Sequence, residues 1–280
     1  MVHGNLEAFD GMEMLEHRLL LSAAPVDADS GLGRHGHRAF DPEEVAALAS
    51  ANAGQTGKKA DLPTFEDAEF DAPVENTYFP LVSGTITVLE AEEEDGIVRS
   101  TTTITSDTKE ILGVAITVVH DVETLFVEEL GITVVLEDTF DWFAADTEGN
   151  VWYFGEDTTA FEFDEDWNQI GSSTEGSWEA GVDGAEPGII MLANPRPGVS
   201  YRQEFAEGIA EDMGKVIRLN GEVSIELGDF EDVLVTKEWS KLEPGTVEFK
   251  YYAPGVGLVF VRELTGGPTV QVELVEIIEP

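Results

Sequence analysis

The chain has 280 residues, 42% of them apolar, which is enough to bury a sizeable core and excludes disorder over the whole length. Its 57 acidic and 15 basic residues give a net charge of −42, and a field of that sign repels nucleic acid and anionic membrane surfaces. Cations are the expected counterparts, and a saline setting would screen the self-repulsion, as for a halotolerant protein. The absence of cysteine excludes disulfides, thiolate metal sites and cysteine nucleophiles.

The composition changes near residue 60. Residues 1–60 hold four of the five histidines, whereas all five tryptophans come later. We therefore predict an export leader over residues 1–24, a flexible linker over residues 25–69 and a single β domain over residues 70–280. No apolar run reaches the roughly 18 residues that a membrane-spanning helix needs, so we expect no membrane span.

The leader contains the segment "MLEHRLLLSA", which follows several acidic residues and has only three consecutive leucines. An ordinary signal peptide has a basic start and a longer apolar run, so the segment does not fit that type. It resembles instead the LEPR-XLL export motif of planctomycete-like bacteria, whose consensus is roughly Leu-Glu-Pro-Arg-X-Leu-Leu-Ser-Ala. The matching positions are Leu15, Glu16, Arg18, Leu20, Leu21, Ser22 and Ala23.

His17 stands where that family usually has proline or aspartate. The resemblance covers about a dozen residues and implies export to the periplasm, the cell surface or the outside, with no activity attached. The alternative is that this segment forms an amphipathic first helix of the folded domain, against which the change in composition near residue 60 argues.

The linker contains one helix signal. Asp41 is placed to cap a short helix near residues 42–52, with Pro42 at its first position and Gly54 just past its end. Its residues are mostly alanine and it has at most three turns, so we expect it to be transient.

The rest of the chain reads as antiparallel β structure, because apolar and polar residues alternate over short runs that are separated by turn signals. We predict an all-β meander, closed into a barrel-like domain or folded as a sandwich. The expected strands cover residues 85–92, 97–106, 110–123, 131–144, 151–163, 199–205, 214–220, 232–239, 246–253, 257–264 and 269–277.

Several segments resemble a family of secreted or lipid-anchored bacterial β proteins without an assigned activity. They are "YFPLVSGT" (78–85), "DTFDWFAADTEGNVWYFGEDT" (138–158), "TEGSWEAGVDGAEPGIIM" (174–191), "YRQEF" (201–205) and "EDVLVTKEW" (231–239). The resemblance spans about residues 76–262, implies an ordered β domain, and brings no catalytic residues with it.

One segment partly matches a calcium-binding loop. Asp164, Asp166, Asn168 and Glu175 occupy positions 1, 3, 5 and 12 of an EF-hand-like loop and offer oxygen ligands. However, Gln169 stands at the sixth position, where the turn needs glycine, and neither flank reads as a helix. A hairpin turn with solvated acids is therefore favoured over a calcium loop, and pairs such as Asp138/Asp141 or Glu156/Asp157 offer weaker cation sites.

Enzymatic interpretations have less support. His120 is the only histidine after residue 37, so a two-histidine metal site is excluded from the folded domain, and no nucleotide-binding loop or serine-hydrolase elbow occurs. Two carboxylates could hydrolyse a glycoside, but the sequence does not single out a pair.

The aromatic residues could form a sugar-stacking platform or a core. Both faces of the strand around Trp152 and Tyr153 are apolar, which favours core packing. We therefore predict a non-enzymatic binding or scaffolding role at the cell surface or outside the cell, assisted by calcium, with cations and a cell-surface or extracellular polymer as partners. The alternative is a carbohydrate-active protein, either a sugar-binding module or a two-carboxylate glycosidase.

Overall fold

The computed structural model describes residues 62–93, 95–264 and 269–280. The export motif and the short helix expected near residues 42–52 lie outside these residues. The described chain is all-β, with one 3-10 turn at Phe65–Asp67, so the predicted fold class is confirmed. No helix in the described ranges is long and apolar enough to span a membrane.

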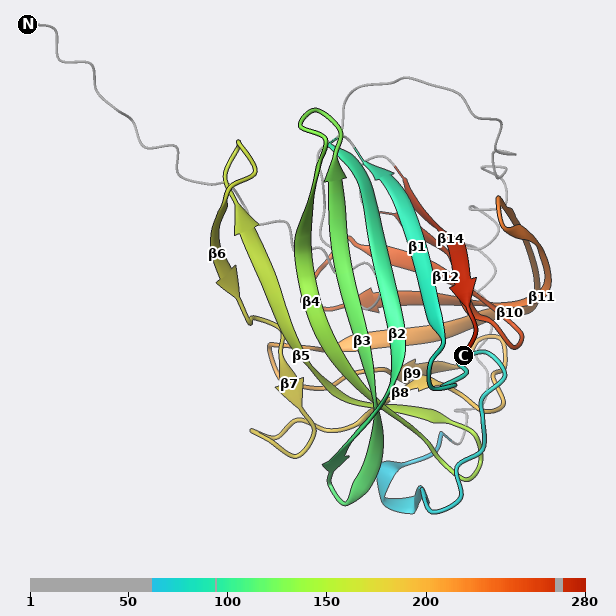
Figure 1. Cartoon of the computed structure of the whole chain (residues 1–280). Helices are drawn as coiled ribbons and strands as arrows, with labels where there is room; N and C mark the ends of the chain where they lie inside the picture. Colours follow the sequence, from blue (N-terminus) through green and yellow to red (C-terminus); the bar gives the residue numbers. More distant parts are fainter. Residues whose placement is uncertain (1–61, 94, 265–268) are drawn as a thin grey trace, which may run out of the picture.

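Antiparallel strands follow one another in a meander that folds into two layers. Figure 1 shows β1 to β5 as one twisted layer, with orange strands of the second half crossing behind it. The first layer contains β1 (Ile86–Glu93), β2 (Gly96–Ile111), β3 (Val114–Val127), β4 (Ile132–Ala145), β5 (Val151–Phe163) and β6 (Gln169–Ser173). Two short strands, β7 (Trp178–Glu179) and β8 (Gly188–Met191), also pair with β5.

The second layer follows in chain order and contains β9 (Ser200–Arg202), β10 (Asp212–Ile225), β11 (Gly228–Ser240), β12 (Val247–Ala253), β13 (Gly257–Leu264) and β14 (Val270–Ile278). The two layers are joined by the pairing of β1 with β14, in which Leu89 lies opposite Leu274. The first and last strands of the meander are therefore neighbours, and every strand from β1 to β5 keeps its sequence neighbour beside it.

The sheet does not close through a continuous ladder, because its order ends at β6 and β9. A single bridge nevertheless connects the two halves where the Glu186 N–H donates to the Phe205 carbonyl over 2.9 Å. Gly188 allows this approach, since a Cβ atom there would lie 2.0 Å from the Gln203 carbonyl oxygen. The two ends of the sheet are thus connected by this bridge, although the sheet itself is not closed.

The strands predicted from alternation are present with different bounds, and the short strands β6, β7 and β8 were not predicted. The strand expected over residues 110–123 is divided by a two-residue hairpin turn, in which Leu112 and Gly113 have φ values of 52° and 81°. Positive φ at both central residues gives a turn whose twist matches the flanking strands. Leucine rarely adopts this conformation, so Leu112 does not indicate a turn in the sequence.

The aromatic strand β5 is covered on both sides, as the sequence predicted. The rings of Phe65 and Phe70 pack edge-on against Trp152 and Phe154, with centroids 5.7–6.4 Å apart. On the other side, the Tyr153 ring stacks on Phe143 and packs edge-on against Trp178. Residues 62–69, which we expected to belong to the linker, thus include the ring of Phe65, which packs against this core.

Candidate functional site

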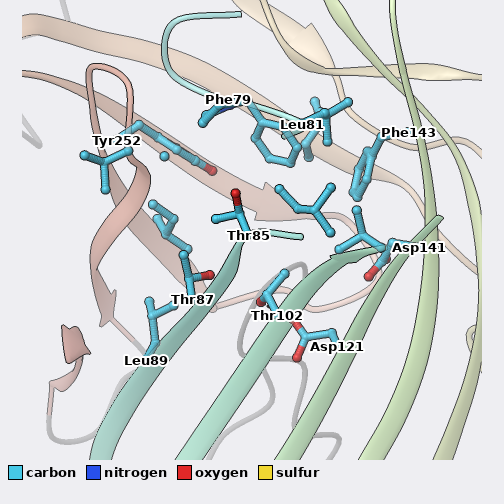
Figure 2. Close-up of a pocket in the computed structure, with 17 residues that line it drawn as sticks. Phe79, Leu81, Thr85, Thr87, Leu89, Thr102, Asp121, Asp141, Phe143 and Tyr252 are labelled. Atoms are coloured by element: carbon cyan, nitrogen blue, oxygen red, sulfur yellow. Dashed lines mark hydrogen bonds between the residues drawn. The ribbon is translucent and has the colours of Figure 1, made fainter. Parts of the chain in front are cut away.

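A cavity of about 120 Å³ lies between the two layers. The inner face of β1 to β4 forms one wall, and residues from β8, β12 and the β12–β13 turn form the other (Figure 2). Most of the lining is apolar; its aromatic and larger aliphatic members include Phe79, Leu89, Val119, Phe143, Ile190 and Tyr252. Among the described residues, Asp121 and Asp141 are the only charged side chains in the lining.

The strand register brings these two acids together. In the β3–β4 pairing, Asp121 lies opposite Thr139 and Asp141 lies opposite Val119. The two aspartates therefore occupy diagonal positions on one face, where Cβ atoms are on the order of 7 Å apart. Because β3 and β4 are both central strands of the layer, the two carboxyl groups are held by backbone pairing on each side.

Both oxygens of Asp121 receive hydrogen bonds from β2. The Ser100 hydroxyl donates to Oδ1 over 2.9 Å and the Thr102 hydroxyl donates to Oδ2 over 2.8 Å. Burial raises the pKa of Asp121 to about 6, while these two hydrogen bonds act in the opposite direction. Asp121 is thus mostly ionised at neutral pH and is held in a fixed orientation.

Asp141 is more deeply buried, with 5% of its surface exposed. The Tyr153 hydroxyl donates to its Oδ1 over 2.6 Å, and Glu156 lies directly opposite on β5. Burial raises the pKa of Asp141 well above its ordinary value, and the neighbouring charge of Glu156 raises it further. Both carboxyl groups of the cavity therefore have raised pKa values, and the pKa of Asp141 lies well above its ordinary value.

The acidic face extends beyond the cavity along the same strands. Glu123 and Glu137 lie opposite each other, two residues from Asp121 and from Thr139 respectively. Glu123 is only 5% exposed, and the Thr139 and Thr158 hydroxyls are hydrogen-bonded to each other over 2.6 Å. The inner face of the first layer thus combines carboxyl and hydroxyl groups, with no basic residue at these positions.

The opposite wall holds a buried ion-pair cluster. Lys250 Nζ lies 3.1 Å from Glu238 Oε2 and 3.1 Å from Glu248 Oε2. Burial lowers the pKa of Lys250, but the two carboxylates raise it by more and keep the lysine charged. Tyr252, which lines the cavity, donates its hydroxyl hydrogen to Glu238 Oε1 over 3.4 Å and so connects the cavity wall with this cluster.

Asn76 positions the loop at the rim of the cavity. Its side-chain amide donates to the Gly149 carbonyl over 2.7 Å and to the Leu192 carbonyl over 3.2 Å, while its Oδ1 accepts from two backbone N–H groups of the rim loop. The Thr77 carbonyl in turn accepts from the Gly255 N–H over 2.7 Å. Loop 76–81 and the β12–β13 turn are therefore held together, and their half-exposed side chains form the rim.

The predicted calcium residues lie away from this cavity. Asp164, Asp166 and Asn168 form the β5–β6 hairpin turn, where Asp164 Oδ1 accepts the Asp166 N–H over 3.0 Å and the Asn168 N–H over 2.8 Å. Hydrogen bonds from Asn168 lower the pKa of Asp164. Glu175 lies beyond β6, and its own N–H donates to Ser173. Within the described residues, no three His, Cys, Asp or Glu side chains are grouped to hold a metal ion, and calcium here stays a prediction.

His120 and the tryptophans do not reach the cavity. His120 Nε2 lies 2.7 Å from Asp138 Oδ1, and its ring stacks on Phe140 on the outer face of the layer. Trp152 and Trp178 are 2% and 6% exposed, so they form core rather than a stacking surface. The predicted preference for core packing is thereby confirmed for these two rings.

The pair of Asp121 and Asp141 was missed in the sequence. Asp138/Asp141 and Glu156/Asp157 stood out only as neighbours along the chain, whereas the register sends Asp141 and Glu156 inward, opposite each other. The sequence did contain one indication of an inward-facing acidic surface, because acids such as Asp121 and Glu123 are two residues apart within an apolar strand. That spacing places both side chains on one face.

No protein-family model matches the chain, and no curated protein matches it. Two solved structures resemble it weakly. One is a proposed exported protein with a YmcC-like fold from Bacteroides fragilis, and the other is a proposed lipoprotein from Parabacteroides distasonis. They are 12% and 10% identical, each covers 73% of this chain and 100% of its own, and both have a TM-score of 0.40. Since both TM-scores are low, the site rests on the geometry of this chain alone.

Proposed function

We propose that the chain is an exported, non-enzymatic binding protein that holds the apolar part of a small ligand in the cavity between its two layers. The observation that carries this proposal is the apolar cavity of about 120 Å³ with two aspartates in its wall. Ligand sites are typically concave and mostly apolar, with a few polar groups that fix orientation. Asp121 and Asp141 are those polar groups.

The size of the cavity limits the ligand. A cavity of roughly 150 Å³ lined by aliphatic and aromatic groups stays dry and takes up benzene. The cavity described above is slightly smaller and has a half-exposed rim, so it suits a short alkyl chain or a small ring whose remainder extends outward. An extracellular polymer that carries such a group is a partner of the expected kind.

The binding proposal is tested with pentanol as a neutral probe in calorimetry and thermal melts. We expect pentanol to raise the melting midpoint, because a ligand that binds only the folded state stabilises it by mass action. Ile104→Phe fills the cavity and should abolish the effect, whereas Val135→Phe, on an exposed position of β4, should leave it intact. Unchanged pentanol binding in Ile104→Phe would sink the proposal.

Export is supported by the leader residues that resemble the LEPR-XLL motif. We expect deletion of residues 1–24 to retain the protein inside a host that exports the full-length chain. Arg18→Glu and Leu20→Asp should act like the deletion. Export of the deleted form would remove the leader from the proposal without affecting the cavity.

A two-carboxylate glycosidase is the second candidate. It is favoured by one observation, the different tendency of Asp121 and Asp141 to ionise, which is what an acid and a base at one site require. The cavity lining contains no tryptophan, and its mostly apolar surface suits a sugar poorly. We expect no hydrolysis of chromogenic glycosides; activity lost in both Asp121→Asn and Asp141→Asn would reverse the ranking.

A further inference from the structure

We infer that the ligand of this cavity carries an ammonium group, which Asp141 binds through a charge-assisted hydrogen bond. This inference rests on the proposed function and adds the charge of the ligand to it. It depends on an unused oxygen atom, on the charges around that atom and on the shape of the cavity.

The unused atom is Asp141 Oδ2. Its partner oxygen, Oδ1, accepts from Tyr153, but Oδ2 accepts no hydrogen bond from any described residue. The side chain lines the cavity and is 5% exposed (Figure 2). Since Oδ2 is not one of the fully enclosed side-chain atoms that lack a partner, it is open to a hydrogen bond from a ligand with N–H hydrogens.

Acidic groups face Asp141 from every strand that packs around it. They are Asp121 on β3, Glu137 on β4 and Glu156 on β5, and each of them acts on Asp141 electrostatically. The neutral Tyr153 hydroxyl is its one hydrogen-bond partner, and Glu204 acts on that tyrosine. None of the cavity-lining residues is basic.

Two basic residues near the cavity already pair with acidic side chains. Lys250, on the opposite wall, is held by Glu238 and Glu248, and His120 pairs with Asp138 on the outer face. A cation in the cavity would therefore meet the carboxyl groups of Asp121 and Asp141, whereas an anion would meet no basic side chain among the lining residues. An ammonium group would favour the ionised form of Asp141, lower its raised pKa and so form a charge-assisted hydrogen bond that an uncharged alcohol does not form.

The shape of the cavity places the two parts of such a ligand. The acids lie on the β3–β4 wall, whereas the rim side chains of Phe79, Leu81 and Leu258 are apolar. An alkyl or ring portion would contact these apolar groups while the ammonium group reaches Asp141. The class of ligand is therefore a small alkylamine or the aminoalkyl end of a larger molecule.

Three probes of equal chain length test the inference on the full-length protein: pentylammonium, pentanol and pentanoate. We expect calorimetry at pH 7.5 to give pentylammonium at least a tenfold lower dissociation constant than pentanol, and pentanoate the weakest binding. The ratio should persist in 0.5 M salt, because a buried pair is screened less than the overall surface charge. The three-probe comparison uses the unaltered protein, so it tests the inference even if a variant does not fold.

Asp141→Asn should reduce the ratio of the pentylammonium affinity to the pentanol affinity to about one. Asp157→Asn is the matched control, because it also removes one acid but lies on an exposed position of β5. Equal affinities for pentylammonium and pentanol would overturn the inference and leave the proposed binding function intact. Tighter binding of pentanoate would also overturn it, and binding of no probe would overturn both.

Discussion

Tyr153 donates its hydroxyl hydrogen to Asp141 Oδ1 across adjacent strands, over 2.6 Å, while Tyr201, which is equally buried, has a hydroxyl with no hydrogen-bond partner in the described residues. The two tyrosines therefore offer a matched comparison. Removal of the Tyr153 hydroxyl leaves a buried carboxyl group with neither oxygen hydrogen-bonded, whereas removal of the Tyr201 hydroxyl relieves an unpaired polar atom.

We expect Tyr153→Phe to lower the free energy of unfolding by about 1–2 kcal/mol and Tyr201→Phe to be neutral or slightly stabilising. The hydrogen bond from Tyr153 lowers the pKa of Asp141, so its loss should raise that pKa further. Urea denaturation measures the first effect and carboxyl-carbon NMR titration the second. Equal costs for the two variants would contradict this account.

Acid should stabilise the protein through Asp121. Its pKa of about 6 in the folded state is above the ordinary value of an unfolded aspartate, so the folded state binds the proton more tightly. The resulting stability is present below about pH 4 and is lost as the pH rises to about 6, by on the order of 2 kcal/mol. Asp121→Asn should reduce the fall of the melting midpoint between pH 4 and 6, and Asp157→Asn should not; Glu248 and Glu263, whose pKa values are raised to about 7, maintain the dependence at higher pH.

The ring of Phe65 should stabilise the domain although it precedes the first strand. It packs edge-on against Trp152 and Phe154, with centroids 6.0 and 5.7 Å away. Because the ring is half-buried, we expect Phe65→Ala to cost about 2–3 kcal/mol, less than a fully buried phenylalanine would. Phe126→Ala, at a position 42% exposed, should cost less than about 1 kcal/mol. Chemical denaturation of both variants provides the comparison.

Asn76 should matter for binding as well as for stability. Asn76→Ala removes the partners of two carbonyl groups and two N–H groups at the rim, so we expect a loss of about 2–3 kcal/mol in unfolding free energy. The loop that carries Phe79 and Leu81 should then be less well positioned, and pentanol should bind at least threefold more weakly. Asn168→Ala, in the exposed β5–β6 turn, should leave pentanol binding unchanged.

Salt should stabilise the protein mainly through screening of its charge of −42. We expect sodium and calcium at equal ionic strength to raise the melting midpoint equally. If calcium raises the midpoint more than sodium does, and Asp166→Asn removes the difference, the predicted loop binds calcium. Asp166 is the informative position, because its side chain takes no part in the hydrogen bonds of the turn, which Asp164 and Asn168 make.

The sequence by itself determined the fold class and most strand positions of this protein. Alternation along residues such as those of β1 and β5 is a local property, and it specifies which side chains share a face once a strand forms. The burial of both faces of β5, with Trp152 and Tyr153 on opposite sides, could also be predicted, since both faces are apolar.

Only the tertiary structure decided which acids meet. Asp121 and Asp141 are 20 residues apart, and their juxtaposition depends on the length of the β3–β4 turn and on a bulge near Glu123. A shift of one residue would send either side chain to the outer face, where Asp138 meets His120 instead. The cavity likewise depends on the second layer and on the loop that Asn76 anchors. Register and layer contact are long-range properties, and local patterns do not encode them.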